Sequence, residues 1–185
     1  RVFYLTDAVR KSARGDSGIQ RLHVVGAGVM GAGIAAHAAS AGLDVLLLDI
    51  VPDGAKDRNQ LARTAIARCL KTDPAPLMLP GHARRIQPAN LEDDLERAAQ
   101  CDWVVEAVVE RLDVKQALFE RIEAARAPDT IVSSNTSTIP LEALVSGLSA
   151  QFRQHFLITH FFNPPRYMRL LEIVQGADTA VDVVA

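Results

Sequence analysis

Residues 26–31 read Gly26-Ala27-Gly28-Val29-Met30-Gly31 and form the glycine pattern GxGxxG. The apolar stretch 22–25 precedes the glycines and has the length of a buried strand, and the alanine-rich stretch 29–41 follows them as a helix. A second apolar stretch, 45–49, ends in Asp49, which lies 18 residues beyond Gly31. This order of strand, glycine turn, helix and second strand, with an acidic residue at its end, predicts a dinucleotide-binding unit.

Each part of this unit has a physical task. Gly26 allows a tight turn, Gly28 lets the backbone approach a pyrophosphate, and Gly31 allows the helix to pack closely on the strand. The first helical turn, with Val29 and Met30, directs its unpaired N–H groups at the phosphates. Asp49 would accept hydrogen bonds from the adenosine ribose and repel a 2′-phosphate, which favours NAD over NADP. FAD, or a glycine turn that binds no dinucleotide, remains an alternative.

The rest of the chain alternates between strand and helix patterns. This alternation predicts an α/β fold of the Rossmann type, with a doubly wound and mostly parallel sheet. A connection rich in proline and glycine separates the two halves at 72–88. The predicted strands are 22–25, 45–49, 103–106, 131–134, 156–162 and 170–174, and the predicted helices are 29–41, 53–71, 91–99, 113–125 and one that starts near Pro140.

Composition excludes several classes of protein. The 185 residues are 49% hydrophobic and 23% charged, which is enough to bury the core of one domain. The formal charge of −2 argues against a general nucleic-acid binder. Cys69 and Cys101 lie far apart without metal-ligand spacing, so we expect no metal site, no disulfide framework and a cytoplasmic location. Residues 22–43 carry no Asp, Glu, Lys or Arg, but their glycines and histidines favour a buried strand–turn–helix over a membrane span.

The ends of the chain suggest a piece of a longer protein. The sequence begins with Arg1 rather than methionine and stops in the run 181–185 without a termination signal. We expect residues 1–20 to be a linker or the end of a preceding domain, and residues 21–185 to be the nucleotide-binding domain.

Three polar side chains lie on or just after predicted strands in the second half. His160 ends an apolar strand, where a lone histidine is more often a hydrogen-bonded core residue than a catalyst. Glu172 interrupts the apolar strand 170–174, and a buried carboxylate is costly unless it is paired. Two strands joined by a Pro-Pro bend could bring Glu172 against His160. Ser137 lies in a polar cluster at the carboxyl end of a strand, where open α/β sheets bind ligands.

Four motifs in order carry a resemblance to a known family. They are GAGVMGAGIA (26–35), VVEAVVE (104–110), SSNTSTI (133–139) and HFFNPPRYMRLLEIV (160–174). Together they resemble the NAD-binding domain of the 3-hydroxyacyl-CoA dehydrogenases of fatty-acid β-oxidation, over about residues 21–175. The resemblance implies that His160 is the catalytic acid/base, that Glu172 orients it, and that Ser137 bonds the substrate oxygen. It also implies cofactor contacts by Glu110, Lys115, Ser137 and Asn163.

The implied reaction is NAD-dependent oxidation of (S)-3-hydroxyacyl-CoA to 3-oxoacyl-CoA. The resemblance further implies an acyl-CoA substrate and a homodimer formed through a helical C-terminal domain that this chain lacks, so the isolated chain should bind NAD with little turnover. Residues 1–5 resemble the connecting segment that precedes this domain in fused enoyl-CoA hydratase/dehydrogenases. The family's CoA-contacting serine falls on or near Ala65. Two alternatives stay open: a dehydrogenase of the same architecture for a smaller hydroxy or sugar acid, and a non-catalytic NAD(H)-binding module.

Overall fold

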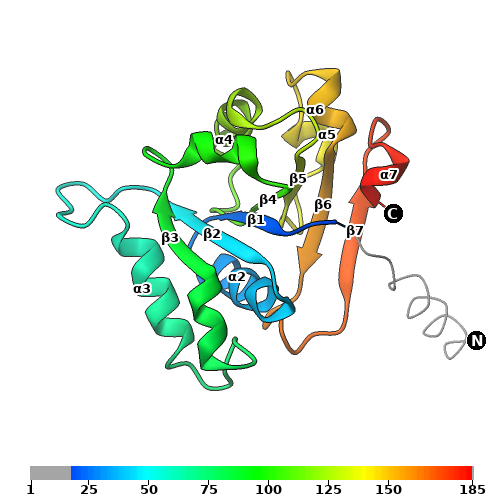
Figure 1. The fold of residues 1–185 in the computed structure, drawn as a ribbon. Helices are drawn as coiled ribbons and strands as arrows, with labels where there is room; N and C mark the ends of the chain where they lie inside the picture. The colour runs from blue at the N-terminus through cyan, green and yellow to red at the C-terminus, as the bar shows by residue number, and fades with distance from the viewer. Residues whose placement is uncertain (1–17, 185) are drawn as a thin grey trace, which may run out of the picture.

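A computed structural model describes residues 18–184, which form a seven-stranded sheet with helices on both faces (Figure 1). The strand order is β3-β2-β1-β4-β5-β6-β7. The strands are β1 Arg21–Val25, β2 Asp44–Asp49, β3 Ile86–Asn90, β4 Trp103–Glu106, β5 Ile131–Ser134, β6 Phe156–Phe161 and β7 Leu171–Gln175. The helices are α2 Val29–Ala41, α3 Gln60–Cys69, α4 Leu112–Ala125, α5 Leu141–Leu144, α6 Ala150–Gln154 and α7 Val181–Val184, with short 3-10 helices η1 Pro80–Arg85 and η2 Leu95–Gln100.

The sheet is parallel except at one edge. β1 pairs in parallel with both β2 and β4, and the parallel pairing continues through β5 to β6. β7 runs antiparallel to β6, because residues 162–170 join these two strands without a crossover helix. The carboxyl ends of β1, β2, β4, β5 and β6 therefore share one edge, where such sheets bind ligands. The predicted Rossmann-type fold is confirmed.

Two apolar layers enclose the sheet. Helices α2 and α3 cover one face, with small buried residues such as Ala35 and Ala65 against Leu22 and Val24 (Figure 1). Helices α4, α5 and α6 cover the other face, where three phenylalanine rings meet at centroid distances of 5.1–6.1 Å. A strand with both faces covered is apolar along most of its length, which explains the apolar stretches seen in the sequence.

The first half of the chain holds the largest differences from the predicted elements. Residues 86–90 form strand β3, although we predicted a connection across 72–88. Pro88 lacks an N–H group and lies on an edge strand, where this loss is tolerated. Helix α3 begins at Gln60 rather than at residue 53, because residues 53–59 form turns around Gly54. The predicted helix 91–99 is instead the short 3-10 helix Leu95–Gln100.

The charge-free stretch 22–43 forms β1 and α2 of this fold. Within residues 18–184, no helix combines the length and the apolar character needed to cross a membrane. The predicted linker 1–20 lies almost wholly outside the described residues, as does the segment 1–5 with its resemblance to a hydratase junction.

Candidate functional site

The glycine turn has the shape that a pyrophosphate requires. Gly26 has a φ of 105°, and a Cβ on it would lie 2.5 Å from the Ala107 carbonyl oxygen. A Cβ on Gly31 would lie 1.7 Å from the Gly26 oxygen, so only glycine lets α2 approach β1 this closely. Gly28 faces open space, and no side chain caps the helix that starts at Val29. The first-turn N–H groups, including that of Met30, are therefore available to an anion.

Asp49 stands at the carboxyl end of β2, beside this turn. Its carboxylate accepts hydrogen bonds from the backbone N–H groups of Ala27 at 2.6 Å and Ile50 at 2.7 Å. The carboxylate thus ties β2 to the glycine turn and still has lone pairs for a ligand. Asp49, Gly26 and Gly28 line a largely apolar hollow of about 580 Å³, whose far wall includes Val108 and Leu118. This hollow suits an adenosine, with an acid at one end for the ribose and apolar walls for the base.

His160 and Glu172 meet as the sequence predicted. The antiparallel register pairs them directly across β6 and β7, and His160 Nδ1 lies 2.9 Å from Glu172 Oε2. Because a carboxylate only accepts hydrogen bonds, Nδ1 carries the proton and Nε2 is left as the acceptor of the ring. Phe162 packs against the imidazole at a centroid distance of 4.6 Å. Ser137 lines the same cavity of about 320 Å³ as His160 and Glu172.

One premise of the Glu172 prediction is wrong. We expected a buried carboxylate, but every residue of β7 is exposed, and 53% of the Glu172 side chain is accessible. β7 is an edge strand whose apolar residues have no covering layer among residues 18–184. The pair therefore forms by strand register rather than by a need to neutralise a buried charge.

Glu110 and Lys115 belong to a network at the carboxyl ends of β4 and β5. The Lys115 side chain is 1% exposed, and its ammonium lies 2.5 Å from Glu106 Oε1 and 3.2 Å from Glu110 Oε2. Glu106, which is fully buried, also accepts from the Ser134 hydroxyl at 2.5 Å. Glu110 is half exposed, and hydrogen bonds, chiefly from Thr136, and the Lys115 charge lower its carboxyl pKa even though burial opposes this.

Sequence reasoning overlooked Glu106 and two further residues near the site. The signal for Glu106 was a carboxylate in an otherwise apolar strand, and a carboxylate of that kind also pointed to Glu172. Asn135 Oδ1 accepts from the Phe161 N–H at 2.9 Å and so holds the end of β6 beside His160. Arg68 on α3 reaches the Ala27 carbonyl at 3.4 Å, which puts a cation near the glycine turn. Asn135 lies in the polar cluster that pointed to Ser137, whereas the sequence offered no local signal for Arg68, whose contact is long-range.

Two other predicted positions lie apart from these clusters. Asn163 is exposed in the turn after β6 and lines neither of the two cavities described above. Ala65, at the position of the family's CoA-contacting serine, is 2% exposed and packs in the core under α2. Cys69 and Cys101 are both buried and free. Among residues 18–184, no group of three or more His, Cys, Asp or Glu side chains could hold a metal ion.

Comparison with known proteins gives consistent matches. The sequence model described as "3-hydroxyacyl-CoA dehydrogenase, NAD binding domain" matches residues 21–185. A probable 3-hydroxyacyl-CoA dehydrogenase of Deinococcus radiodurans is 48% identical over 166 residues, which are 90% of this chain and 48% of that protein. A protein of the same description from Bacillus subtilis is 44% identical over 180 residues, covering 90% of this chain and 23% of that protein.

The crystal structure of 3-hydroxybutyryl-CoA dehydrogenase from Escherichia coli K12 superposes with a TM-score of 0.74 at 33% identity. The superposition covers 90% of this chain and 34% of that one. The chain thus spans about half or less of the length of these relatives.

Proposed function

Because the chain belongs to the 3-hydroxyacyl-CoA dehydrogenase family and contains its NAD-binding domain, we propose that it is the nucleotide-binding part of an enzyme that oxidises (S)-3-hydroxyacyl-CoA to 3-oxoacyl-CoA in β-oxidation. The observation that carries the proposal is the His160–Glu172 pair at 2.9 Å, which shares a cavity with Ser137. A binding module without catalysis has no need of an oriented proton acceptor at the ligand edge of the sheet.

The residues present fit NAD. Gly26, Gly28 and the first turn of α2 would hold the pyrophosphate, and Asp49 would hold the adenosine ribose. Glu110, Lys115, Ser137 and Asn163 are proposed contacts on the nicotinamide side, by resemblance to the family. When bound, NAD supplies the hydride acceptor for the oxidation of a secondary alcohol.

The chain's own side chains would manage the proton and the oxygen. His160 Nε2 accepts the proton of the substrate hydroxyl, because its Nδ1 is already committed to Glu172. Glu172 keeps the ring in this tautomer and stabilises the imidazolium that forms. The Ser137 hydroxyl donates toward the substrate oxygen and, in the reverse direction, toward the charge that develops there.

The proposed substrate class, oligomeric state and cellular location rest on the same family. We propose that the substrate is an acyl-CoA, that the full-length protein is a homodimer formed through a helical C-terminal domain, and that the enzyme is cytoplasmic. Two free buried cysteines support a reducing compartment.

The decisive test is NADH formation by the full-length protein. We expect turnover with (S)-3-hydroxybutyryl-CoA and, in reverse, with acetoacetyl-CoA, and none with free 3-hydroxybutyrate. Turnover of the free acid alone would support the smaller-substrate alternative. Calorimetric binding of NADH without turnover of any of these substrates would support a non-catalytic module.

A further inference from the structure

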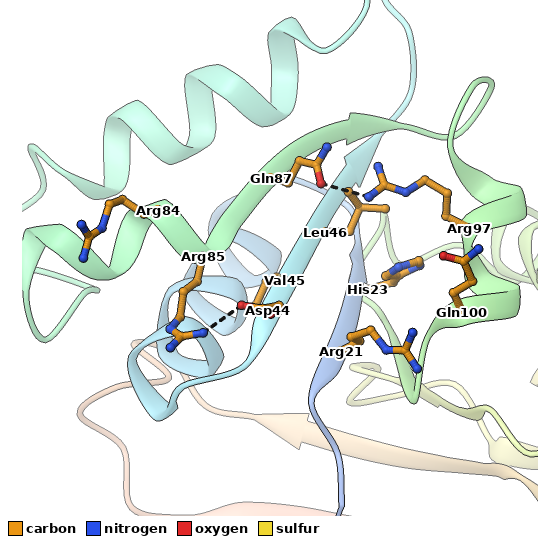
Figure 2. Close-up of a pocket in the computed structure, with 10 residues that line it drawn as sticks. All are labelled: Arg21, His23, Asp44, Val45, Leu46, Arg84, Arg85, Gln87, Arg97 and Gln100. Atoms are coloured by element: carbon orange, nitrogen blue, oxygen red, sulfur yellow. Dashed lines mark hydrogen bonds and ion pairs between the residues drawn. The ribbon is translucent and has the colours of Figure 1, made fainter.

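A third pocket lies at the edge of the sheet opposite the glycine turn. It has a volume of about 330 Å³ and opens at the amino ends of β1, β2 and β3, beside η2 (Figure 2). Since β1 runs from Arg21 toward Gly26, the pocket and the proposed NAD site are at opposite ends of the same strand. Of the described residues that line this arginine pocket, a single one, Asp44, is acidic, and four are arginines: Arg21, Arg84, Arg85 and Arg97.

Each guanidinium group of the pocket is held by a protein partner but keeps N–H donors that no described residue accepts. A guanidinium has five N–H donors, and each of these side chains donates only one or two of them to another described residue. The remaining donors are free to bind a ligand. Three aspartates anchor three of the arginines at N–O distances of 2.8, 3.2 and 3.3 Å: Asp44 holds Arg85, Asp94 holds Arg97, and Asp102 holds Arg21.

His23 lies within the pocket and has no partner of its own. It is 8% exposed, and its ring forms no hydrogen bond with any residue of the described part of the chain. Figure 2 shows the ring between Arg97, Gln100 and Arg21. Burial, followed by the charges of Arg97 and Arg21, lowers the pKa of His23 to about 4, against the opposing charge of Asp94. The ring nitrogens of His23 line the pocket without a partner among the described residues, and a ligand in this pocket would supply one.

We propose that the arginine pocket binds a small molecule that carries a phosphate group. The planar donor forks of Arg21 and Arg97 match pairs of phosphate oxygens, and neutral His23 adds a further donor. A volume of about 330 Å³ exceeds what one phosphate fills, so a small organic group can accompany it. The same chemistry is offered by inorganic phosphates and by the phosphate of a nucleotide.

The test measures the melting temperature of the chain with inorganic pyrophosphate or AMP at pH 7.5. Sodium chloride of equal ionic strength is the reference, and NADH is present throughout to occupy the glycine turn. We expect a rise of about 3–6 °C at ten times the Kd, which increases further with the logarithm of the ligand concentration. A larger response to AMP would identify a nucleotide ligand, and a larger response to pyrophosphate would identify an inorganic one.

Two variants and one control assign the response to the arginine pocket. Arg21→Gln and Arg97→Gln should each weaken binding about tenfold or more, because each removes charge-assisted hydrogen bonds. Arg63→Gln is the matched control: Arg63 is 61% exposed and paired with Asp57, much as Arg21 is 56% exposed and paired with Asp102, but it lies on α3. The control should bind like the wild type.

A second measurement needs no variant. The ring resonances of His23 should shift and saturate with pyrophosphate or AMP in NMR titrations. Unmoved His23 resonances, or equal responses in the control and both pocket variants, would overturn the proposal.

Discussion

Asp49 combines two tasks in one carboxylate. It holds the glycine turn through Ala27 and Ile50, and it is the proposed partner of the ribose. Because backbone N–H groups already hold the carboxylate, its position does not depend on the ligand. A preorganised acceptor of this kind increases affinity, because less side-chain entropy is lost when the ligand binds.

Replacement of Asp49 by alanine should therefore weaken NAD binding and reduce the preference for NAD over NADP. Lost hydrogen bonds to a charged group cost about 1.5–3 kcal/mol, which corresponds to about 10- to 150-fold in Kd. Calorimetry with both cofactors measures the effect, and Asp53→Ala, an exposed acid four residues away, is the control. An unchanged NAD/NADP ratio in Asp49→Ala would show that Asp49 does not contact the ribose.

His160 and Glu172 should act as one unit. In the full-length protein, His160→Gln removes the proton acceptor and should lower kcat about 10²- to 10⁴-fold. Glu172→Gln should also lower kcat severely, and the double variant should be little worse than the more damaging single variant. NADH affinity should hardly change, since neither residue is assigned to the adenosine half.

The exposure of Glu172 sharpens this experiment. With 53% of its side chain accessible, the pair contributes little to stability, so melting temperatures should stay near the wild type. Glu142→Gln, which changes another carboxylate of the same cavity, is the matched control and should retain activity. Strong destabilisation with near-normal kcat in the folded protein would refute the catalytic role.

At the scale of elements, one buried ion pair joins two strands to a helix. Glu106 ends β4, Ser134 ends β5, and Lys115 lies in the first turn of α4. The Lys115–Glu106 bond of 2.5 Å and the Ser134–Glu106 bond bring these three element ends together at the ligand edge. Glu106 also accepts from the Val108 N–H at 2.7 Å, which shapes the turn that follows β4.

Lys115→Met should destabilise the chain strongly. It leaves the fully buried Glu106 without its ammonium partner, a loss that costs about 3–5 kcal/mol in comparable pairs. The double variant Glu106→Gln/Lys115→Met should recover part of this loss, because no buried charge is then stranded. Urea unfolding measures both, with the exposed Lys71→Met as control. A loss in Lys115→Met no larger than in the control would mean that the pair does not stabilise the junction.

At the scale of the whole molecule, the two edges of the sheet differ in chemistry. The carboxyl edge carries the glycine turn, Asp49 and the His160–Glu172 pair, whereas the amino edge carries the arginine pocket around His23. His23 also links this pocket to global stability, because it must stay neutral to remain buried.

The free energy of unfolding should fall as pH falls from about 6.5 toward 4. The pKa of His23 is about 4 in the folded chain against its usual 6.5, so between these values the unfolded state binds a proton that the folded state does not. Protonation then favours unfolding, by an amount on the order of 3 kcal/mol. Burial and then Arg166 lower the pKa of His37 too, which adds to the slope in the same direction.

His23→Gln should flatten this pH dependence, and His155→Gln, which removes a histidine from the loop before β6, should keep the wild-type slope. Chemical denaturation at several pH values measures it. An unchanged slope in His23→Gln would show that His23 does not cause this pH dependence of the free energy of unfolding.

The sequence by itself determined the features that depend on local pattern. The glycine turn needs particular residues at fixed spacing, and strands covered on both faces must be apolar, so β1, α2, β4 and β5 were predicted with nearly correct bounds. The His160–Glu172 pair also followed from sequence, because the connection between the two strands is too short for the crossover that parallel pairing needs.

Only the tertiary structure decided which strand lies at an edge and which side chains from distant segments meet. Two predictions were wrong because a strand lies at an edge. β3 was predicted as a connection, but an edge strand tolerates Pro88, and Glu172 was predicted to be buried, but the edge strand β7 leaves it exposed. The Glu106–Lys115 pair and the arginine pocket depend on contacts between elements whose packing no local periodicity encodes. Periodicity along the chain reports whether a face is buried, whereas strand order and cross-element contacts are properties of the packed whole.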